Sequence, residues 1–253
     1  MVYFSKVANI ESNFLINGLL RSVRHDQPLN LEVLAKHKVS AALAAHYSRT
    51  GWLTRLGPGV YAFPGGRLDR DQCLLFLQGG TNGLHVGGKT ALAWQGVTHY
   101  LSTVETLTLW GAEKATLPSW FISQFPSSYR SWALLNKKVA GRGLFTPPEL
   151  TARVKVSARE RALLELLRDI RTEVDLEEAR HLFFATKGMR VKTAGELLEG
   201  CTNVRTVRLF LMWGHEADNI DVEQLRARYI LPTGSSSRWI GKLADGTKLV
   251  LPT

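Results

Sequence analysis

The feature that most constrains this chain lies at residues 51–63, where two short apolar segments flank a Gly-Pro-Gly tip. Both segments are rich in aromatic and branched side chains, which suit a pleated, half-buried surface. Gly57 and Gly59 tolerate a positive φ angle, and Pro58 presets the φ of a turn residue. The run therefore predicts a β-hairpin.

Three helices are predicted before this hairpin. Apolar residues recur at helical spacing between Val7 and Arg21. Asn30 and Ser40 are good N-cap residues for a short second helix and for a third helix over 41–50. Three helices followed by a hairpin are the order of a winged helix-turn-helix, whose third helix enters the major groove of DNA. The alternative is an ordinary small helical subdomain.

The residues expected at DNA lie on the third helix, in the turn before it, on the hairpin and just after the hairpin. Small residues at the start of the third helix would let it lie deep in the groove. Polar side chains nearby would then reach base edges or phosphates. The candidate DNA-binding residues are Lys38, Ser40, His46, Arg49, Arg55 and Arg67.

The distribution of charge favours DNA binding over a purely structural subdomain. Residues 1–68 contain eight Lys or Arg and three Asp or Glu, which gives half of the chain's net charge of +10. Positive charge concentrated on one module is typical of a surface that binds phosphates. The sequence therefore favours double-stranded DNA as a partner, and it does not favour a membrane surface.

The two cysteines and the apolar runs indicate a cytoplasmic protein. Cys73 and Cys201 are too few and too far apart for a disulfide framework, so a reducing compartment is expected. No apolar run reaches the length of a membrane span, and we recognise no signal peptide.

A second domain is expected after Pro64-Gly65-Gly66, which is the candidate boundary. We expect a winged helix-turn-helix domain at 1–66 and a mixed α/β domain at 67–253, so the fold class is α+β. The clearest helix is predicted over 157–170, with Ser157 and Glu160 as a capping box. Strands are predicted over 106–110 and 132–135, and the turn at 244–246 predicts a C-terminal hairpin.

Residues Gly83–Thr90 match the pattern of a phosphate-binding loop. In such a loop Lys89 would reach the terminal phosphates and Thr90 would hold magnesium. However, the chain around the motif lacks the strand–loop–helix alternation that this site requires. The preferred interpretation is that Gly87 and Gly88 allow a close turn and that Thr90 helps to start a helix. A nucleotide-binding enzyme that uses Lys89 and Thr90 stays as an alternative.

The sequence indicates no metal-binding site and no catalytic site. The seven histidines are scattered, and neither cysteine has a near neighbour that would complete a metal site. We therefore expect no metal, no cofactor and no catalytic residues, and the protein is interpreted as a non-enzyme. Arg205, Arg208 and Arg238 form either a basic patch or a solvated surface.

Several segments, in this order, resemble the AbiEi-type antitoxins, which are the transcriptional-regulator half of type IV toxin–antitoxin systems. The resemblance covers nearly the whole chain. The matching segments are residues 40–61, 85–92 with Gly96, 160–162, 164–167, 207–211 and 250–252.

The resemblance implies a protein with two functions. Its winged helix would bind inverted repeats upstream of its own operon and repress that operon. Its second domain would neutralise a toxin that resembles a nucleotidyltransferase, with or without direct contact, and the segment at 85–88 would belong to the core of this domain. The remaining alternative is a regulator without a toxin, whose second domain senses a small molecule.

Overall fold

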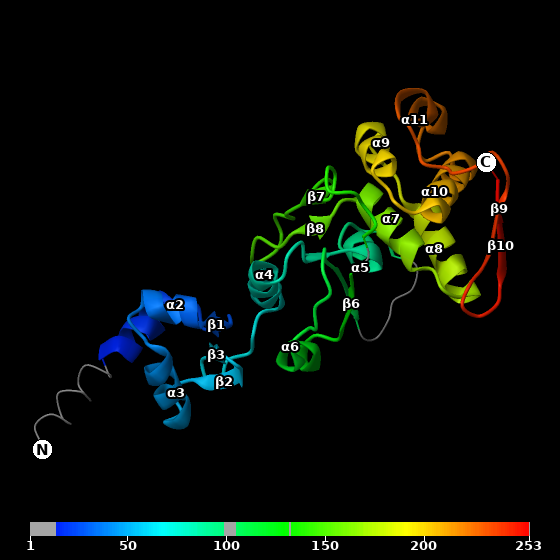
Figure 1. The fold of residues 1–253 in the computed structure, drawn as a ribbon. Coiled ribbons are helices and arrows are strands. Elements are labelled where there is room, and N and C mark those ends of the chain that lie inside the picture. The colour runs from blue at the N-terminus through cyan, green and yellow to red at the C-terminus, as the bar shows by residue number, and fades with distance from the viewer. Residues whose placement is uncertain (1–13, 99–104, 132, 253) are drawn as a thin grey trace, which may run out of the picture. The chain divides into compact units, whose positions relative to one another are not determined.

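The computed structural model describes residues 14–98, 105–131 and 133–252 of the chain. The chain folds into two compact units (Figure 1). The first unit contains Met1–Gly80, Leu117–Gln124 and Leu150–Ala152, and the second contains Thr81–Thr116, Phe125–Glu149 and Arg153–Thr253. No helix among the described residues is both long enough and apolar enough to span a membrane.

The first unit contains the predicted helices in the predicted order. Residues 14–22 are helical, and the expected start of this helix at Val7 lies outside the described residues. They are followed by β1 (Leu29–Asn30), α2 (Leu31–Lys36) and α3 (Ala41–Arg49). The Asn30 side chain accepts a hydrogen bond from Val33 N, and the Ser40 side chain accepts one from Leu43 N. Both predicted N-caps are therefore confirmed.

The predicted hairpin is also present in this unit. It consists of β2 (Thr54–Gly57) and β3 (Val60–Ala62), which pair antiparallel, and β1 pairs with the other edge of β3. Gly59 has a φ of 68°, which the tip requires. The helices and the sheet enclose one apolar core, formed by Ile16, Leu19, Leu29, Leu34, Val39, Ala44, Tyr47, Leu53, Tyr61 and Phe63.

The first unit extends beyond the boundary expected at Gly66. It includes α4 (Arg70–Gly80), α6 (Ser119–Gln124) and residues 150–152. The rings of Phe76 and Trp120 meet edge to face with centroids 6.1 Å apart. The side-chain amide of Gln72 donates to the carbonyl of Thr151 at 3.1 Å. Segments far apart in the sequence therefore complete this unit.

The second unit is organised around a mixed five-stranded sheet. Its strands are β4 (His85–Val86), β5 (Leu107–Trp110), β6 (Ser127–Arg130), β7 (Leu144–Phe145) and β8 (Val156–Ser157), in the order β6-β5-β4-β8-β7. The pairs β5–β6 and β4–β8 are parallel, and the other two are antiparallel. The strand predicted at 106–110 is confirmed. Of the strand predicted over 132–135, residue 132 lies outside the described residues. No strand forms over 133–135, where Leu135 makes only an isolated bridge with Cys201.

Helices supply the rest of the second unit. They are α5 (Gly88–Ala93), α7 (Arg159–Asp169), α8 (Glu173–Ala185), α9 (Val191–Glu199), α10 (Val204–Ala217) and α11 (Val222–Arg228). The ring of Phe183 packs edge to face on Phe210 and Trp213, with centroids 5.2 and 5.8 Å away. The predicted C-terminal hairpin is confirmed as the antiparallel pair β9 (Trp239–Lys242) and β10 (Lys248–Leu251). The fold class α+β is confirmed.

The capping box predicted at the start of α7 is wrong. The N-cap residue is Ala158, without a side-chain cap. Ser157 is the last residue of β8, and its fully buried hydroxyl donates to Glu165 at 2.8 Å. The Glu160 carboxylate instead accepts from the backbone N–H of Arg190 at 2.7 Å. Both side chains are bonded to other parts of the unit, so neither accepts from the backbone N–H groups at the start of α7.

Candidate functional site

The structure places all six sequence-predicted DNA-binding residues on the surface of the first unit. Lys38, in the turn before α3, is exposed and has a positive φ of 61°. Ser40 caps α3, and His46 and Arg49 are exposed on that helix. The other two predicted residues, Arg55 on β2 and Arg67 after β3, are also exposed.

The exposed face of α3 combines small and polar side chains. Ala42, Ala45, His46 and Arg49 occupy positions i, i+3, i+4 and i+7, which places them on one face of a helix. Ala44 and Tyr47 lie on the opposite face and are buried in the core. The outer face of α3 is therefore fixed by the packing of its inner face and carries only small and polar side chains.

Negative charge is absent from the chain around this helix. Residues 33–68 contain no Asp or Glu, whereas Lys36, Lys38, Arg49, Arg55 and Arg67 all lie within them. The Arg55 Nε donates to the carbonyl of Gly57 at 3.4 Å, which holds the side chain along the hairpin. Lys36 pairs with Glu32 of the same helix at 2.9 Å, but no carboxylate within residues 33–68 offsets the other four cations. Such a surface attracts phosphates.

The second unit contains a buried charge cluster around Glu165 of α7. One carboxylate oxygen, Oε1, lies 2.7 Å from His85 Nε2 and 2.8 Å from Arg161 Nε. The other, Oε2, accepts from the hydroxyl of Ser157 at 2.8 Å and from Gly88 N at 3.0 Å. The Glu165 carboxylate is therefore bonded on both oxygens by donors from four different segments.

The partners of Glu165 are themselves held in place. His85 Nδ1 lies 2.7 Å from the carbonyl oxygen of Gly83, so each ring nitrogen faces an acceptor. Arg161 Nη1 donates to the carbonyls of Ala140 and Arg142 at 2.7 and 2.8 Å. Burial alone would raise the pKa of Glu165, but His85 and Arg161 outweigh burial and lower that pKa to about 2. The carboxylate is thus a charged structural centre.

This cluster accounts for the sequence that resembles a phosphate-binding loop. Residues 85–86 lie in β4, in the middle of the sheet, and do not wrap around an anion. Gly88 N donates to the Glu165 carboxylate, and the Thr90 hydroxyl accepts from Thr108 N at 2.8 Å. A Cβ on Gly87 would collide with Glu165 and lie 2.7 Å from Trp110 Cδ1. The motif therefore serves the core, which favours the close turn predicted at Gly87 and Gly88. The prediction that Thr90 helps to start a helix is wrong, because Gly87 precedes α5 without a side-chain cap and the Thr90 hydroxyl bonds to Thr108.

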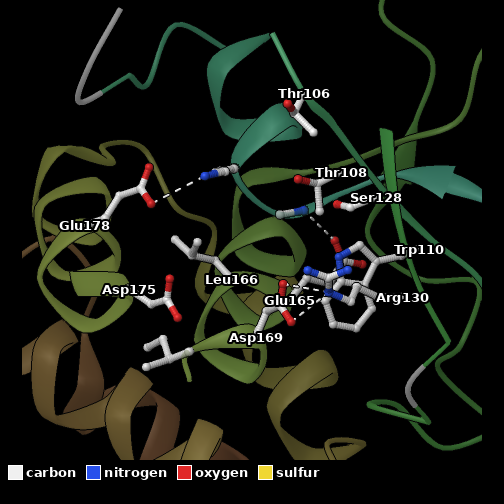
Figure 2. A pocket seen from close by; sticks show the side chains of 13 residues that line it. Thr106, Thr108, Trp110, Ser128, Arg130, Glu165, Leu166, Asp169, Asp175 and Glu178 are labelled. Carbon is white, nitrogen blue, oxygen red and sulfur yellow. Dashed lines mark hydrogen bonds and ion pairs between the residues drawn. The ribbon is translucent and has the colours of Figure 1, made fainter. Parts of the chain in front are cut away.

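A cavity of about 330 Å³ opens beside this cluster. Helix α7 forms one wall with Glu165, Leu166 and Asp169, and strands β5 and β6 form another (Figure 2). The polar residues of the strand wall are Thr106, Thr108, Trp110, Ser128 and Arg130. The sequence carries one signal for this shared face, the alternation of Thr106, Thr108 and Trp110 along the strand predicted over 106–110.

The three arginines considered as a basic patch are not equivalent. The guanidinium of Arg208 is buried and donates to backbone carbonyls, including Thr233 O at 2.7 Å and Ser237 O at 2.8 Å. Arg205 lies instead beside Arg168, Arg171 and Lys242 around a hollow of about 200 Å³. Arg208 is therefore a structural residue, Arg205 lies among three other cations, and Arg238 is exposed.

Potential metal ligands do not gather among the described residues. No group of three or more His, Cys, Asp or Glu side chains is close enough together to hold a metal ion in that part of the chain. Cys73 and Cys201 are free and buried. Burial raises the pKa of the Cys73 thiol to about 12 and that of Cys201 to about 11, so neither is a ready nucleophile.

Comparison with solved structures shows a shared fold. The crystal structure of the RV2827C protein from Mycobacterium tuberculosis matches with a TM-score of 0.52 over 92% of this chain and 91% of that chain. The two sequences are 16% identical over the match, so the likeness concerns the fold alone. No curated protein matches the chain at a comparable level of significance.

Comparison with protein families covers both units. Residues 12–103 match the family described as the N-terminal domain of the AbiEi antitoxin, a transcriptional regulator. Residues 104–251 match the family described as the AbiEi antitoxin and transcriptional regulator of type IV toxin–antitoxin systems. These matches agree with the resemblance read from the sequence segments. The chain therefore belongs to the AbiEi family of antitoxins and transcriptional regulators of type IV toxin–antitoxin systems.

Proposed function

We propose that this protein represses its own operon by binding inverted repeats in the promoter through a winged helix-turn-helix in the first unit. Helix α3 enters the major groove, and the β2–β3 hairpin acts as the wing. The single observation that carries this proposal is the surface formed by residues 33–68. It is free of Asp and Glu and exposes Lys38, Arg49, Arg55 and Arg67.

Each candidate residue has a role that follows from its place. Arg49 and Arg55 contact phosphates or base edges from the helix and the wing, and Lys38 and Arg67 add phosphate contacts. Ser40 and His46 lie close to the bases, because the first turns of the recognition helix approach the base edges. The thin set of polar groups on α3 implies that phosphate contacts contribute much of the affinity.

The second part of the proposal assigns toxin neutralisation to the second unit. The family described as a type IV antitoxin matches residues 104–251, most of which lie in this unit. The toxin is a nucleotidyltransferase-like protein, and neutralisation requires no chemistry from the antitoxin itself. The protein acts in the cytoplasm, where its promoter is. A nucleotide-dependent enzyme is less well supported, since Gly88 and Thr90 already bond within the core.

A promoter-fusion assay in cells tests both parts of this proposal. The full chain should repress a reporter placed behind its own upstream region, and it should restore growth when the neighbouring toxin gene is induced. The double variant Arg49→Ala and Arg55→Ala should lose repression and still restore growth. Arg21→Ala with Arg228→Ala is the control, because it removes the same charge from exposed positions outside α3 and the hairpin.

The outcomes separate the two functions. Full repression by the Arg49→Ala and Arg55→Ala variant would contradict the assignment of the DNA surface. Repression without any restoration of growth by the wild-type chain would contradict the antitoxin role alone.

A further inference from the structure

The strand wall of the cavity contains a buried donor without a partner. The side chain of Trp110 is 2% exposed, and its Nε1–H has no hydrogen-bond partner among the described residues. An unmet buried donor costs free energy unless something else accepts from it. Gly88 keeps the space near this group open, since a Cβ there would lie 3.6 Å from Trp110 Nε1.

An arginine on the same wall is oriented by a carboxylate. Arg130 Nε donates to both oxygens of Asp169 at 2.8 Å, and Nη1 makes one long contact of 3.4 Å with the Tyr129 carbonyl. Nη2 takes part in none of these contacts. The Arg130 side chain is 27% exposed, so its outer edge can meet a ligand. A guanidinium held in this way is preorganised to bind an oxyanion with two parallel hydrogen bonds.

Hydroxyl groups lie on the same wall, and the acids in the cavity are already engaged. Thr108 and Ser128 are paired residues on β5 and β6, and both line the cavity (Figure 2). Asp175 accepts from the backbone N–H groups of Arg171 and Thr172, and Glu178 contacts Lys89 at 3.4 Å. The strand wall therefore offers hydrogen-bond donors, whereas the acids of the cavity lie on α7 and α8.

We propose that this cavity binds a small organic molecule through a carboxylate or phosphate group. The oxyanion is held by Arg130, by the indole N–H of Trp110 and by the hydroxyls of Ser128 and Thr108. A volume of about 330 Å³ admits a molecule the size of an amino acid or a phosphorylated amino acid. This site goes beyond DNA binding and toxin neutralisation, and its test requires neither DNA nor toxin.

The test is a nuclear magnetic resonance titration of the full chain labelled with ¹⁵N. The signal of the Trp110 indole N–H is identified as the one missing from the spectrum of Trp110→Phe. The probes are O-phospho-L-serine for the phosphate class and L-glutamate for the carboxylate class, with sodium chloride at equal ionic strength. We expect a saturable shift of the Trp110 signal with at least one probe and none with the salt. The probe with the lower titration midpoint identifies which oxyanion the site prefers.

Variants connect the shift to the proposed contacts. Arg130→Lys loses the bidentate contact and should weaken binding by about 10-fold or more. Ser128→Ala removes one neutral hydrogen bond and should weaken binding by roughly 3- to 10-fold. Ser127→Ala is the matched control on β6, because Ser127 Oγ already donates to the Phe125 carbonyl at 2.6 Å. Circular dichroism checks that each variant is folded.

Two results would overturn the inference. One is the absence of any shift of the Trp110 signal with either probe up to about 10 mM, which is weaker than ordinary ligand binding. The other is a shift whose midpoint is the same in the wild type, in Ser128→Ala and in Arg130→Lys. Neither result bears on repression or on toxin neutralisation, so failure here is distinct from failure of the proposed function.

Discussion

At the residue scale, Glu165 organises the second unit. The apolar stripe of α7 was readable from the sequence, and Arg161 and Glu165 stand one helical turn apart. The partner His85 is 80 residues away, so no local pattern could connect it to Glu165. The place of Ser157 before a helix suggested an N-cap, but its hydroxyl bonds to the side chain of Glu165 instead.

Removal of the charge on Glu165 should destabilise the protein strongly. Glu165→Gln leaves the Arg161 guanidinium buried without its counter-charge, so the free energy of unfolding should fall by about 3–5 kcal/mol. Urea unfolding followed by circular dichroism measures this change. Glu177→Gln, at an exposed position on α8, is the control and should change stability by less than about 0.5 kcal/mol. A mild effect at Glu165 would mean that the cluster is not the structural centre described above.

The pH dependence follows from the pKa of Glu165, which is lowered from 4.5 to about 2 in the folded chain. The contribution to stability is present above the unfolded pKa and is lost as the pH falls toward 2. Between about pH 5 and pH 3 this one group should account for about 2 kcal/mol of lost stability. The carboxyl carbon shift of Glu165, followed by nuclear magnetic resonance, should stay constant down to about pH 3. A titration midpoint near 4.5 would contradict the assignment.

At the scale of elements, local signals predicted the first unit and the C-terminal hairpin well. The side chains of Asn30 and Ser40, the Gly-Pro-Gly tip and the Asp245-Gly246 turn each act within a few residues, so the sequence alone reveals them. The five-stranded sheet was not predicted, since several of its strands are only two residues long. Such strands are defined by distant partners, as when Val86 pairs with Val156, and not by periodicity.

Ser40, at the start of α3, caps the helix and is also a predicted DNA-binding residue. Ser40→Ala removes the cap on Leu43 N and should lower the free energy of unfolding by about 1 kcal/mol. Ser40→Asp keeps an acceptor at the cap and should keep the stability of the wild type. Its negative charge should nevertheless weaken DNA binding, because α3 would then present a carboxylate to the phosphates. Thermal unfolding and fluorescence anisotropy measure the two effects. Equal DNA affinity for Ser40→Asp and the wild type would place Ser40 away from the DNA.

At the scale of the whole molecule, the sequence suggested candidate DNA-binding residues in the first unit, but it did not reveal the cavity of the second unit. The six predicted DNA-binding residues lie on neighbouring elements and are all exposed, so helical spacing and charge were enough to select them. Whether they contact DNA stays a prediction. The cavity wall of Trp110 and Arg130 depends on the parallel pairing of β5 and β6, which only the folded chain reveals.

The most direct test of the account is an anisotropy titration of the full chain. The labelled duplexes are its own upstream region and a scrambled sequence, each at two salt concentrations. We expect tighter binding to the upstream duplex. For the Arg49→Ala and Arg55→Ala variant, we also expect a salt dependence reduced by about two phosphate contacts. Equal affinity for both duplexes, or an unchanged salt dependence in the variant, would contradict a sequence-specific regulator that binds through α3 and the hairpin.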